Sequence, residues 1–509
     1  MKLKNFSNMR NRNLTMKNRT SVILVNFVHD SYLYDIATML QSDSDSTIIQ
    51  AGYANLLPED RQVNINFSQV DNPKKIEKNL LKMKPFFYNS DYEKQERTYL
   101  GMFLTLLNRT TLGIFDANIC NFYFRFLLNF FREEIIKINP SLIVFDSTPH
   151  MPAEFCLFIA AKQLGIKTIY PSRVHLGPRV IFMENLPYFE AIPKHNVVSG
   201  ADENFPTKSP WLRRSVEQNK SSNNSTENVF SKNVLIRIRA KISITISYAR
   251  KSFKIISTSR WRSHYFHLDR VQSARILFLN FYRYRRQLRF LHQKAKFRVS
   301  ETLPKEYCCF MLQYQPERST MPEAFEFSDQ ISALLYLRSV LPEKMPILVK
   351  EHPKQLQLNP GNPRPLQFRS ELFYKTIVSI DNVFLVEPNF DSLRIIAEAK
   401  LVSSATGSAI LEALDIGVPC LSFARNWLSD FEFAPFVLDV STTALDVARL
   451  MNVNRETIKL EFEKYKREHL NFSIMTLDSE RVTSFYSAQE IQLFQRNFVD
   501  YIKLALSSN

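Results

Sequence analysis

The stretch KLVSSATGSAILEALDIGVPCLSF, residues 400–423, decides the fold class of this chain. It begins with a short apolar run, continues with Ile410, Leu411 and Leu414 at helical spacing, and ends in a second apolar run. A buried strand, a helix and another buried strand at this spacing form a βαβ unit with parallel strands. The pattern therefore predicts an α/β protein.

The same alternation extends upstream of residue 400. Short apolar runs that predict strands alternate with amphipathic stretches that predict helices, as in a Rossmann-like domain. The predicted strands are 306–313, 346–350, 382–388, 400–405 and 418–423, and the predicted helices are 328–341, 372–380, 392–399 and 407–417.

A second α/β run lies in the N-terminal half. Its predicted strands are 21–25, 47–53, 141–146 and 166–171, and its predicted helices are 31–40, 122–138 and 153–165. Because one hydrophobic core rarely exceeds about 250–300 residues, a chain of 509 residues is expected to form two domains.

The predicted architecture is α/β, with two Rossmann-like domains facing a central cleft and a basic helical insertion between them. A long amphipathic helix is expected near the C-terminus. The predicted division is a basic disordered tail (1–20), an N-terminal domain (21–205), a basic, partly disordered and partly helical insertion (206–300), a C-terminal domain (301–485) and a C-terminal helix (486–509).

The net charge of +16 is concentrated in one segment. Residues 207–298 hold 22 Lys/Arg and 3 Asp/Glu, so the rest of the chain is slightly acidic. Basic residues interleaved with aromatic ones suit an anionic membrane surface or an acidic polymer, and Arg283, Arg285, Arg286 and Arg289 are the predicted contacts. The alternative is a solvated helical face with aromatics packed on the core. Nucleic acid is not expected, because no motif of a known reader is present.

The N-terminus lacks the apolar core of a secretory signal, and no apolar run is long enough to span a bilayer. The five cysteines are scattered and show no metal-ligand spacing, so we expect no metal site and a reduced cytosolic compartment.

Polar residues follow the predicted strands of the C-terminal half, where parallel sheets bind ligands. Lys350, His352 and Pro353 follow the strand 346–350, and Lys350 and His352 are expected to project into the crevice and to contact a phosphate. The alternative is an ordinary exposed loop.

Two further groups follow the neighbouring strands. Thr406 or Ser408 is expected to cap the helix 407–417, whose first N–H groups form an anion site, and Glu412 could accept hydrogen bonds from ribose hydroxyls. Gln315 and Glu317 follow the strand 306–313. The alternatives are a simple helix cap with a surface glutamate, and a solvated turn.

In the N-terminal half, Asp30 follows the first strand, and Asp146 and His150 follow the strand 141–146. Any of the three could take a proton from a hydroxyl group. The alternatives are a helix N-cap for Asp30 and a turn-forming role for Asp146.

The motifs LQYQPE (312–317), SDQ (328–330), VKEHPK (349–354) and the stretch 404–423 together resemble bacterial capsule and surface-polysaccharide glycosyltransferases, including the Kdo-transferase-like capsule proteins. Polysialyltransferases and teichoic-acid glycerophosphotransferases share a similar His-Pro motif. The resemblance covers residues 305–430 well and extends to 142–170.

The resemblance implies a GT-B fold and a metal-independent glycosyltransferase that needs no cofactor beyond its nucleotide-sugar substrate. It implies that His352 and Pro353, with Lys350, contact the donor phosphate. The nucleotide would lie against Thr406, Gly407, Ser408 and Glu412, with Ser408 replacing the second Thr of the family's T-G-T. The N-terminal domain would bind the acceptor and supply the base.

The resemblance further suggests a CMP-Kdo-like donor, a polysaccharide or glycolipid acceptor, and cytoplasmic work at the inner face of the membrane. A glycerophosphotransferase or sugar-nucleotide epimerase on the same fold is one alternative. A non-catalytic protein that binds polymer or membrane is another.

Overall fold

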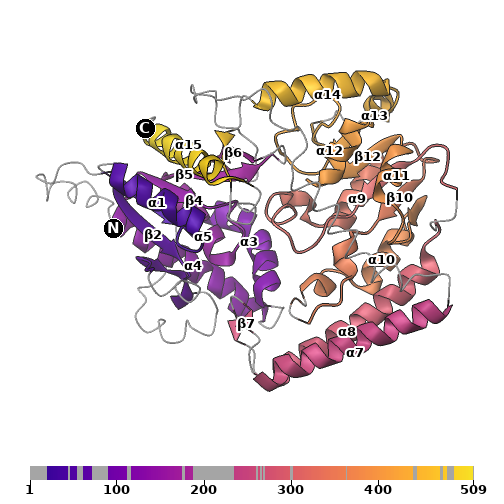
Figure 1. Cartoon of the computed structure of the whole chain (residues 1–509), viewed down its shortest axis with the longest axis horizontal. Helices are drawn as coiled ribbons and strands as arrows, with labels where there is room; N and C mark the ends of the chain where they lie inside the picture. Colours follow the sequence, from indigo (N-terminus) through magenta and orange to yellow (C-terminus); the bar gives the residue numbers. More distant parts are fainter. Residues whose placement is uncertain are drawn as a thin grey trace, which may run out of the picture.

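The computed structural model consists of two α/β units with a helical hairpin beside the second one (Figure 1). It describes residues 20–43, 46–53, 61–70, 90–111, 116–174, 178–186, 234–258, 262–263, 266–267, 270–297, 302–360, 362, 364–439, 444–470, 474–477 and 486–507. The predicted tail up to residue 19 and all of 187–233 lie outside these ranges.

The first sheet has seven strands in the order β14-β6-β5-β4-β1-β2-β3. Strand β1 lies between β2 and β4 and is parallel to both, whereas β6 pairs antiparallel with β5 and β14. The strands are β1 (Ser21–Val25), β2 (Thr47–Gly52), β3 (Ile65–Asn66), β4 (Leu142–Phe145), β5 (Lys167–Arg173), β6 (Arg179–Met183) and β14 (Ile474–Met475).

Helices cover both faces of this sheet, because successive strand residues point to opposite sides. Val22 and Leu24 pack with α1 and α15, whereas Ile23 and Val25 pack in the core that includes α3, α4 and α5. These helices are α1 (Ser31–Asp43), α3 (Ser90–Thr111), α4 (Ala117–Ile138), α5 (Pro152–Gln163) and α15 (Ala488–Ser507), with the short 3-10 helix η2 at Phe67–Gln69.

The second sheet has five parallel strands in the order β11-β10-β9-β12-β13. The strands are β9 (Cys308–Met311), β10 (Ile347–Lys350), β11 (Val383–Leu385), β12 (Leu401–Ser404) and β13 (Cys420–Ser422). The helices that follow or connect them are η4 (Phe325–Ser328), α9 (Gln330–Val340), η5 (Pro353–Leu356), η6 (Arg364–Gln367), α10 (Glu371–Val378), α11 (Ser392–Ala397), α12 (Ser408–Asp415), α13 (Ala444–Met451) and α14 (Arg455–Leu470).

The basic segment between the two units is helical, as predicted, and its helices α7 (Val234–Thr258) and α8 (Arg270–Lys294) form an antiparallel hairpin that was not predicted. The short strands β7 (Arg262–Ser263) and β8 (Phe266–His267) pair at its turn. Helix α8 packs along α10 of the second unit, and α7 lies outside it (Figure 1).

All strands and helices predicted from the sequence are present. Helix α4 begins at Ala117, five residues before the predicted start, because Asp116 accepts a hydrogen bond from the Ile119 N–H at 3.0 Å and caps it. Helices α3, α13 and α14 and strands β3, β6 and β14 were not predicted. Strand β14 and helix α15 return the chain to the first unit, and this return comes before residue 485.

No helix in the described ranges is long and apolar enough to cross a membrane. Cys156, Cys308, Cys309 and Cys420 are buried as small apolar side chains, and burial raises the pKa of each thiol.

Candidate functional site

The predicted nucleotide-binding residues lie at the topological switch point of the second sheet. Strands β10 and β11 follow β9 on one side, and the chain then crosses to β12 on the other side. Parallel α/β sheets bind ligands at the carboxyl ends of the strands that flank such a crossing. Gln313 follows β9 there, and Thr406 and Gly407 follow β12.

The N-terminus of α12 is capped by a side chain from the neighbouring loop. In the amide orientation that gives both of its polar atoms partners, the Gln313 oxygen accepts hydrogen bonds from Thr406 N (2.6 Å) and Gly407 N. Its nitrogen then donates to Ser319 Oγ at 3.2 Å. The N-cap residue is Gly407 and it makes no side-chain cap, so the expectation that Thr406 or Ser408 caps the helix is corrected. The N–H groups of Thr406 and Gly407, which were expected to bind an anion, are bonded to the Gln313 amide oxygen.

Ser408 and Glu412 lie one turn apart on α12. The Ser408 hydroxyl donates to the Glu412 carboxylate, and Ser408 is exposed. The surrounding protein raises the pKa of Glu412 because it removes water from the carboxylate.

His352 follows β10 and is oriented by its own loop. Its Nδ1 accepts a hydrogen bond from Lys354 N at 3.2 Å, so the ring proton is on Nε2. Its pKa is lowered to about 3, first because burial disfavours the imidazolium and then because Lys354, Lys350 and Arg369 repel it. His352 is therefore a neutral imidazole that offers Nε2–H as a hydrogen-bond donor.

The expectation that Lys350 projects into the crevice is wrong. Lys350 is only 2% exposed, and its ammonium group donates to the carbonyl of Pro388 at 2.6 Å. Burial lowers its pKa to about 8, against the opposing effects of Glu351 and Asp391. Lys350 is thus a buried cation that is bonded within the protein.

Gln315 is also turned inward, which the sequence did not reveal. Its amide oxygen accepts from Arg369 Nη1, and its amide nitrogen donates to Ser328 O at 2.9 Å. Both polar atoms of the side chain are used within the protein, so Gln315 shapes the loop and does not contact a donor.

A buried ion pair missed by the sequence analysis holds this loop to the His-Pro loop. Arg369 Nε lies 2.8 Å from Glu351 Oε2, and Arg369 Nη2 donates to Gln313 O at 3.0 Å. Glu351 also accepts from Tyr374 Oη at 2.7 Å and from His352 N at 2.8 Å. Residues after β9 and β10 are thereby fixed to one another.

Two glutamine side chains hold the backbone on either side of Tyr314. The Gln330 amide bonds both the N–H and the carbonyl of Gln313, at 2.8 and 3.2 Å. The Gln355 amide does the same for Gln315, at 2.8 and 3.0 Å. Tyr314 between them is presented to His352, with ring centroids 5.6 Å apart.

Glu317 and Pro353 stand at the rim of this arrangement. Glu317 is exposed, and the protein around it still raises the pKa of its carboxyl. Its Oε2 accepts a hydrogen bond from Ser319 Oγ at 3.3 Å. Pro353 is the first residue of η5, whose N-cap is His352.

Asp30 and Asp146 lie at the switch point of the first sheet, after β1 and β4. Asp30 caps α1, because its Oδ1 accepts from Leu33 N at 2.7 Å. Asp146 accepts from the hydroxyl of Ser147 at 3.3 Å, and its N–H donates to Val25 O. The helix N-cap weighed as the alternative for Asp30 is therefore present.

His150 is oriented by a buried glutamate. Its Nδ1 lies 2.9 Å from Thr148 O, and a carbonyl only accepts, so Nδ1 carries the proton and Nε2 carries the lone pair. Glu154 Oε2 lies 3.5 Å from the same Nδ1 and accepts from His150 N at 3.1 Å. His150 thus has the tautomer that a general base requires.

Glu154, Asn26 and His29 were not singled out by the sequence analysis. Glu154 is 2% exposed, and Asn26, with φ +65°, donates to it at 2.7 Å. Burial raises the pKa of Glu154, whereas burial and then Arg61 lower the pKa of His29 to about 4. Gly52 allows this packing, since a Cβ there would lie 3.0 Å from His29 Nε2.

The loops at the two switch points meet. Thr148 Oγ1, after β4, donates to Glu323 Oε1, after β9, at 2.7 Å. The rings of Tyr99 on α3 and Phe325 also make an edge contact, with centroids 6.3 Å apart. Burial raises the pKa of Tyr314, and Arg109 of α3 is among the groups that oppose this, so Arg109 lies within electrostatic reach of the second domain.

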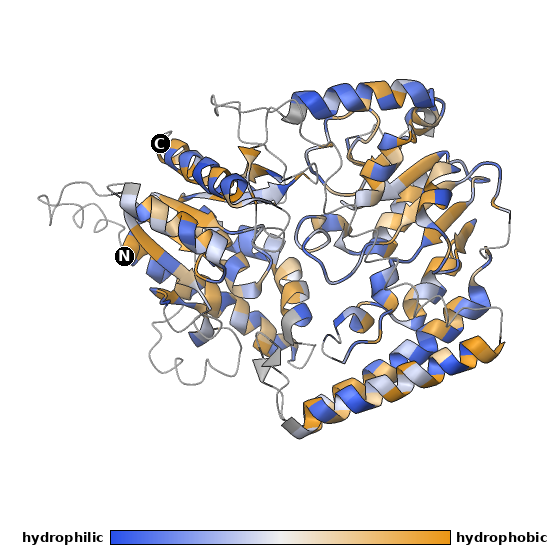
Figure 2. Ribbon diagram, in the orientation of Figure 1, coloured by the Kyte–Doolittle hydropathy of each residue, from blue (hydrophilic) through white to orange (hydrophobic). Residues whose placement is uncertain are grey.

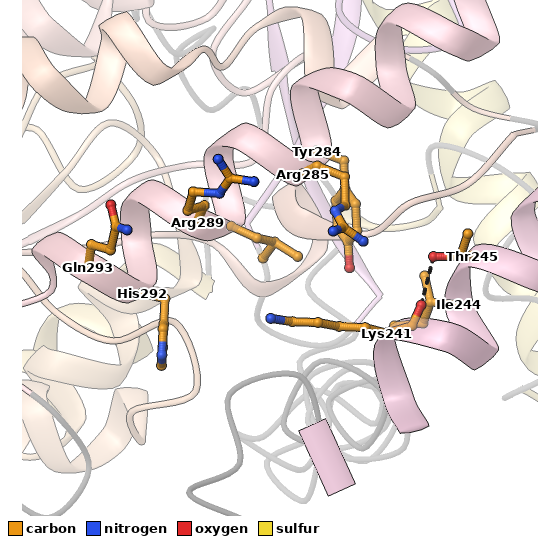
Figure 3. Close-up of a pocket in the computed structure, with 9 residues that line it drawn as sticks. Lys241, Ile244, Thr245, Tyr284, Arg285, Arg289, His292 and Gln293 are labelled. Atoms are coloured by element: carbon orange, nitrogen blue, oxygen red, sulfur yellow. Dashed lines mark hydrogen bonds between the residues drawn. The ribbon is translucent and has the colours of Figure 1, made fainter. Parts of the chain in front are cut away.

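The four arginines predicted to bind membrane or acidic polymer do not share one environment. Arg286 forms an ion pair with Glu371 of α10 at 2.6 Å. Arg285 and Arg289 line a pocket between α7 and α8 (Figure 3), whereas Arg283 is half-buried.

No family model matches the chain, and no curated protein is significantly similar to it in sequence. A UDP-GlcNAc 2-epimerase from Methanocaldococcus jannaschii is 11% identical, covering 88% of this chain and 99% of its own, with a TM-score of 0.22. That from Neisseria meningitidis, bound to UDP-GlcNAc, is 11% identical over 96% and 100% of the two chains, with a TM-score of 0.20. The β-Kdo 2,4 transferase KpsC from Thermosulfurimonas dismutans is 9% identical over 57% and 71%, with a TM-score of 0.23.

TM-scores this low carry no argument about activity. The assignment to the GT-B type rests on the molecule itself. It has two Rossmann-like domains, their switch-point loops meet, and a C-terminal helix packs on the first domain.

Proposed function

We propose that this protein is a glycosyltransferase that moves a sugar from a nucleotide-activated donor, of the CMP-Kdo kind, to a growing capsule or surface polysaccharide or glycolipid. The observation that carries the proposal is that the loops at the switch points of the two sheets meet and carry different kinds of polar group. The loops of the second sheet carry N–H groups that could donate to a phosphate, those of His352, Thr406 and Gly407. The loop after β4 of the first sheet carries His150, whose Nε2 is the unprotonated ring nitrogen and could act as a base.

On the donor side, His352 Nε2–H would donate to an oxygen of the donor phosphate, and buried Lys350 would add a positive field. The N–H groups of Thr406 and Gly407 would bind the same phosphate after Gln313 moves aside. Glu412 would accept hydrogen bonds from the ribose hydroxyls.

On the acceptor side, His150 Nε2 would take the proton of the acceptor hydroxyl. That oxygen would form a bond to the anomeric carbon of the donor sugar. The bond from this carbon to the phosphate oxygen would break, and the nucleotide would leave with the electron pair. Glu154 would act as a positioning residue for His150. The work would take place on the cytoplasmic side of the inner membrane.

Calorimetric titration with CMP, CDP, UDP, GDP and ADP, with and without magnesium, tests the donor site. We expect one nucleotide to bind without metal and His352→Ala to weaken it about 10- to 100-fold, since a hydrogen bond to a charged group is lost. His352→Gln, whose amide nitrogen can replace Nε2, should recover part of the loss.

The reaction itself is tested by incubating the matching nucleotide sugar with and without glycan acceptors and analysing the products. Sugar transfer that requires acceptor supports the proposal. An epimerised nucleotide sugar formed without acceptor, or the absence of any nucleotide binding, would overturn it.

A further inference from the structure

The α7–α8 hairpin exposes an apolar row that nothing in the described structure covers. Ile238, Ile242, Ile246 and Phe253 are 47%, 53%, 47% and 74% exposed. The spacings of four, four and seven residues place them on one face of α7. On α8, Val271, Phe278 and Tyr282 form a similar exposed row. Contiguous exposed apolar side chains mark an interaction surface.

The charge of the hairpin is of one sign. Helix α7 carries six Lys/Arg and α8 carries seven, and neither helix contains Asp or Glu. Apolar and basic residues alternate along both helices (Figure 2). An amphipathic helix with an apolar row between Lys and Arg is the pattern of a segment that lies in the surface of an anionic bilayer.

A pocket of about 220 Å³ opens between the two helices (Figure 3). Lys241, Arg285, Arg289 and His292 line it together with Thr245, whose hydroxyl donates to Lys241 O at 2.7 Å, and none of the described lining residues is acidic. Burial, followed by Arg237, Arg285 and Arg289, lowers the pKa of Lys241, so these cations repel one another. An anionic group in the pocket would relieve this repulsion, and a phosphate suits its donors.

The pocket borders the apolar row of each helix. Thr245 follows Ile238 and Ile242 at seven and three residues, so the pocket borders the apolar row of α7. On α8, Arg285 and Arg289 follow Tyr282 at three and seven residues. Because both rows border one pocket, a single flat surface can contact all three.

We infer that this side of the α7–α8 hairpin docks the protein on an anionic lipid bilayer, with lipid phosphates held in the pocket and the apolar row of α7 placed among the lipid chains. A second copy of the chain is a poor occupant, because two surfaces without acidic residues repel each other. Nucleic acid or an acidic protein would neutralise the charge but leave the isoleucine row exposed to water.

Flotation of the full chain with vesicles tests the inference. We expect binding to vesicles of equimolar phosphatidylcholine and phosphatidylglycerol, and at least tenfold weaker binding to phosphatidylcholine alone. The triple variants Ile238→Ser/Ile242→Ser/Ile246→Ser and Lys241→Gln/Arg285→Gln/Arg289→Gln should each reduce partitioning at least tenfold. Lys459→Gln/Lys464→Gln/Arg467→Gln on α14 removes the same charge elsewhere and should have little effect.

Phe253→Ser controls for loss of binding through misfolding, because this side chain is too exposed to stabilise the fold. This variant should also weaken vesicle binding. Excess inorganic phosphate tests whether the pocket prefers free phosphate to the phosphate of a lipid headgroup. We expect vesicle binding to persist in excess phosphate. Full displacement by phosphate, wild-type binding by the isoleucine variant, or self-association that depends on this row would overturn the inference. Nucleotide binding should be unchanged in all these variants, so failure here is distinct from failure of the proposed transferase.

Discussion

The two switch points of this protein hold their polar residues in different ways. In the second domain, buried side chains that touch no ligand, Arg369, Gln330 and Gln355, hold the loops that carry His352 and Tyr314. In the first domain, the two aspartates are themselves part of the support, since Asp30 caps a helix and Asp146 accepts a hydrogen bond from Ser147, whereas Glu154 orients His150. A separate support leaves a residue available for chemistry, which favours His352 and His150 over the two aspartates.

The largest effect is expected for His150→Ala. Loss of the general base should lower kcat about 10²–10⁴-fold, with nucleotide affinity unchanged. Asp30→Ala and Asp146→Asn are matched changes on the same switch point and should retain kcat within a few-fold. Steady-state transfer rates and a nucleotide titration check this. If Asp146→Asn is the variant that loses kcat, Asp146 and not His150 is the base.

Arg369→Met tests the support in the second domain. It leaves Glu351 as a buried charge without its partner and should lower the free energy of unfolding of that domain by about 3–5 kcal/mol. The control is Arg394→Met, which breaks an exposed pair with Glu398 and should cost less than about 0.5 kcal/mol. Urea unfolding measures both. Equal losses would mean that the buried pair is not what holds the loops.

Lys350 predicts the pH dependence of donor binding. Its pKa is about 8 in the free protein, and a phosphate favours its protonated form, so affinity should be constant up to about pH 8 and fall above it, by at most tenfold per pH unit. Titrations above pH 7, where the phosphate is already ionised, check this. Lys350→Met should bind more weakly and show no such fall. A flat wild-type profile would show that the buried charge does not reach the ligand.

The smallest effect is expected for Gln313→Ala. Removing the side chain that occupies Thr406 N and Gly407 N should strengthen phosphate binding about fivefold, the equivalent of one hydrogen bond. A calorimetric titration decides the sign. Weaker binding would mean that the Gln313 amide contacts the nucleotide itself.

The sheets could be predicted from the sequence because a parallel strand buried on both faces is a continuous apolar run, as in SVILV (21–25). The buried side-chain pairs that hold the loops could not be predicted. Glu351 and Arg369 are 18 residues apart, and Glu154 meets Asn26 across 128 residues. The local sequence around each residue gives no indication of a partner so far away in the chain. The burial of the Lys350 side chain could not be predicted for the same reason, since the carbonyl that accepts its hydrogen bond, Pro388 O, belongs to a later loop.

The return of the chain to the first sheet has a consequence for biosynthesis. Phe498 of α15 packs against Phe27 and Phe182, and the hydroxyl groups of Tyr32 and Thr476, beside β14, form a hydrogen bond. One face of the first domain is thus closed by residues that leave the ribosome more than 280 residues after β6. The domain that begins first is completed last, and its uncovered apolar face must be shielded while the second domain is being translated.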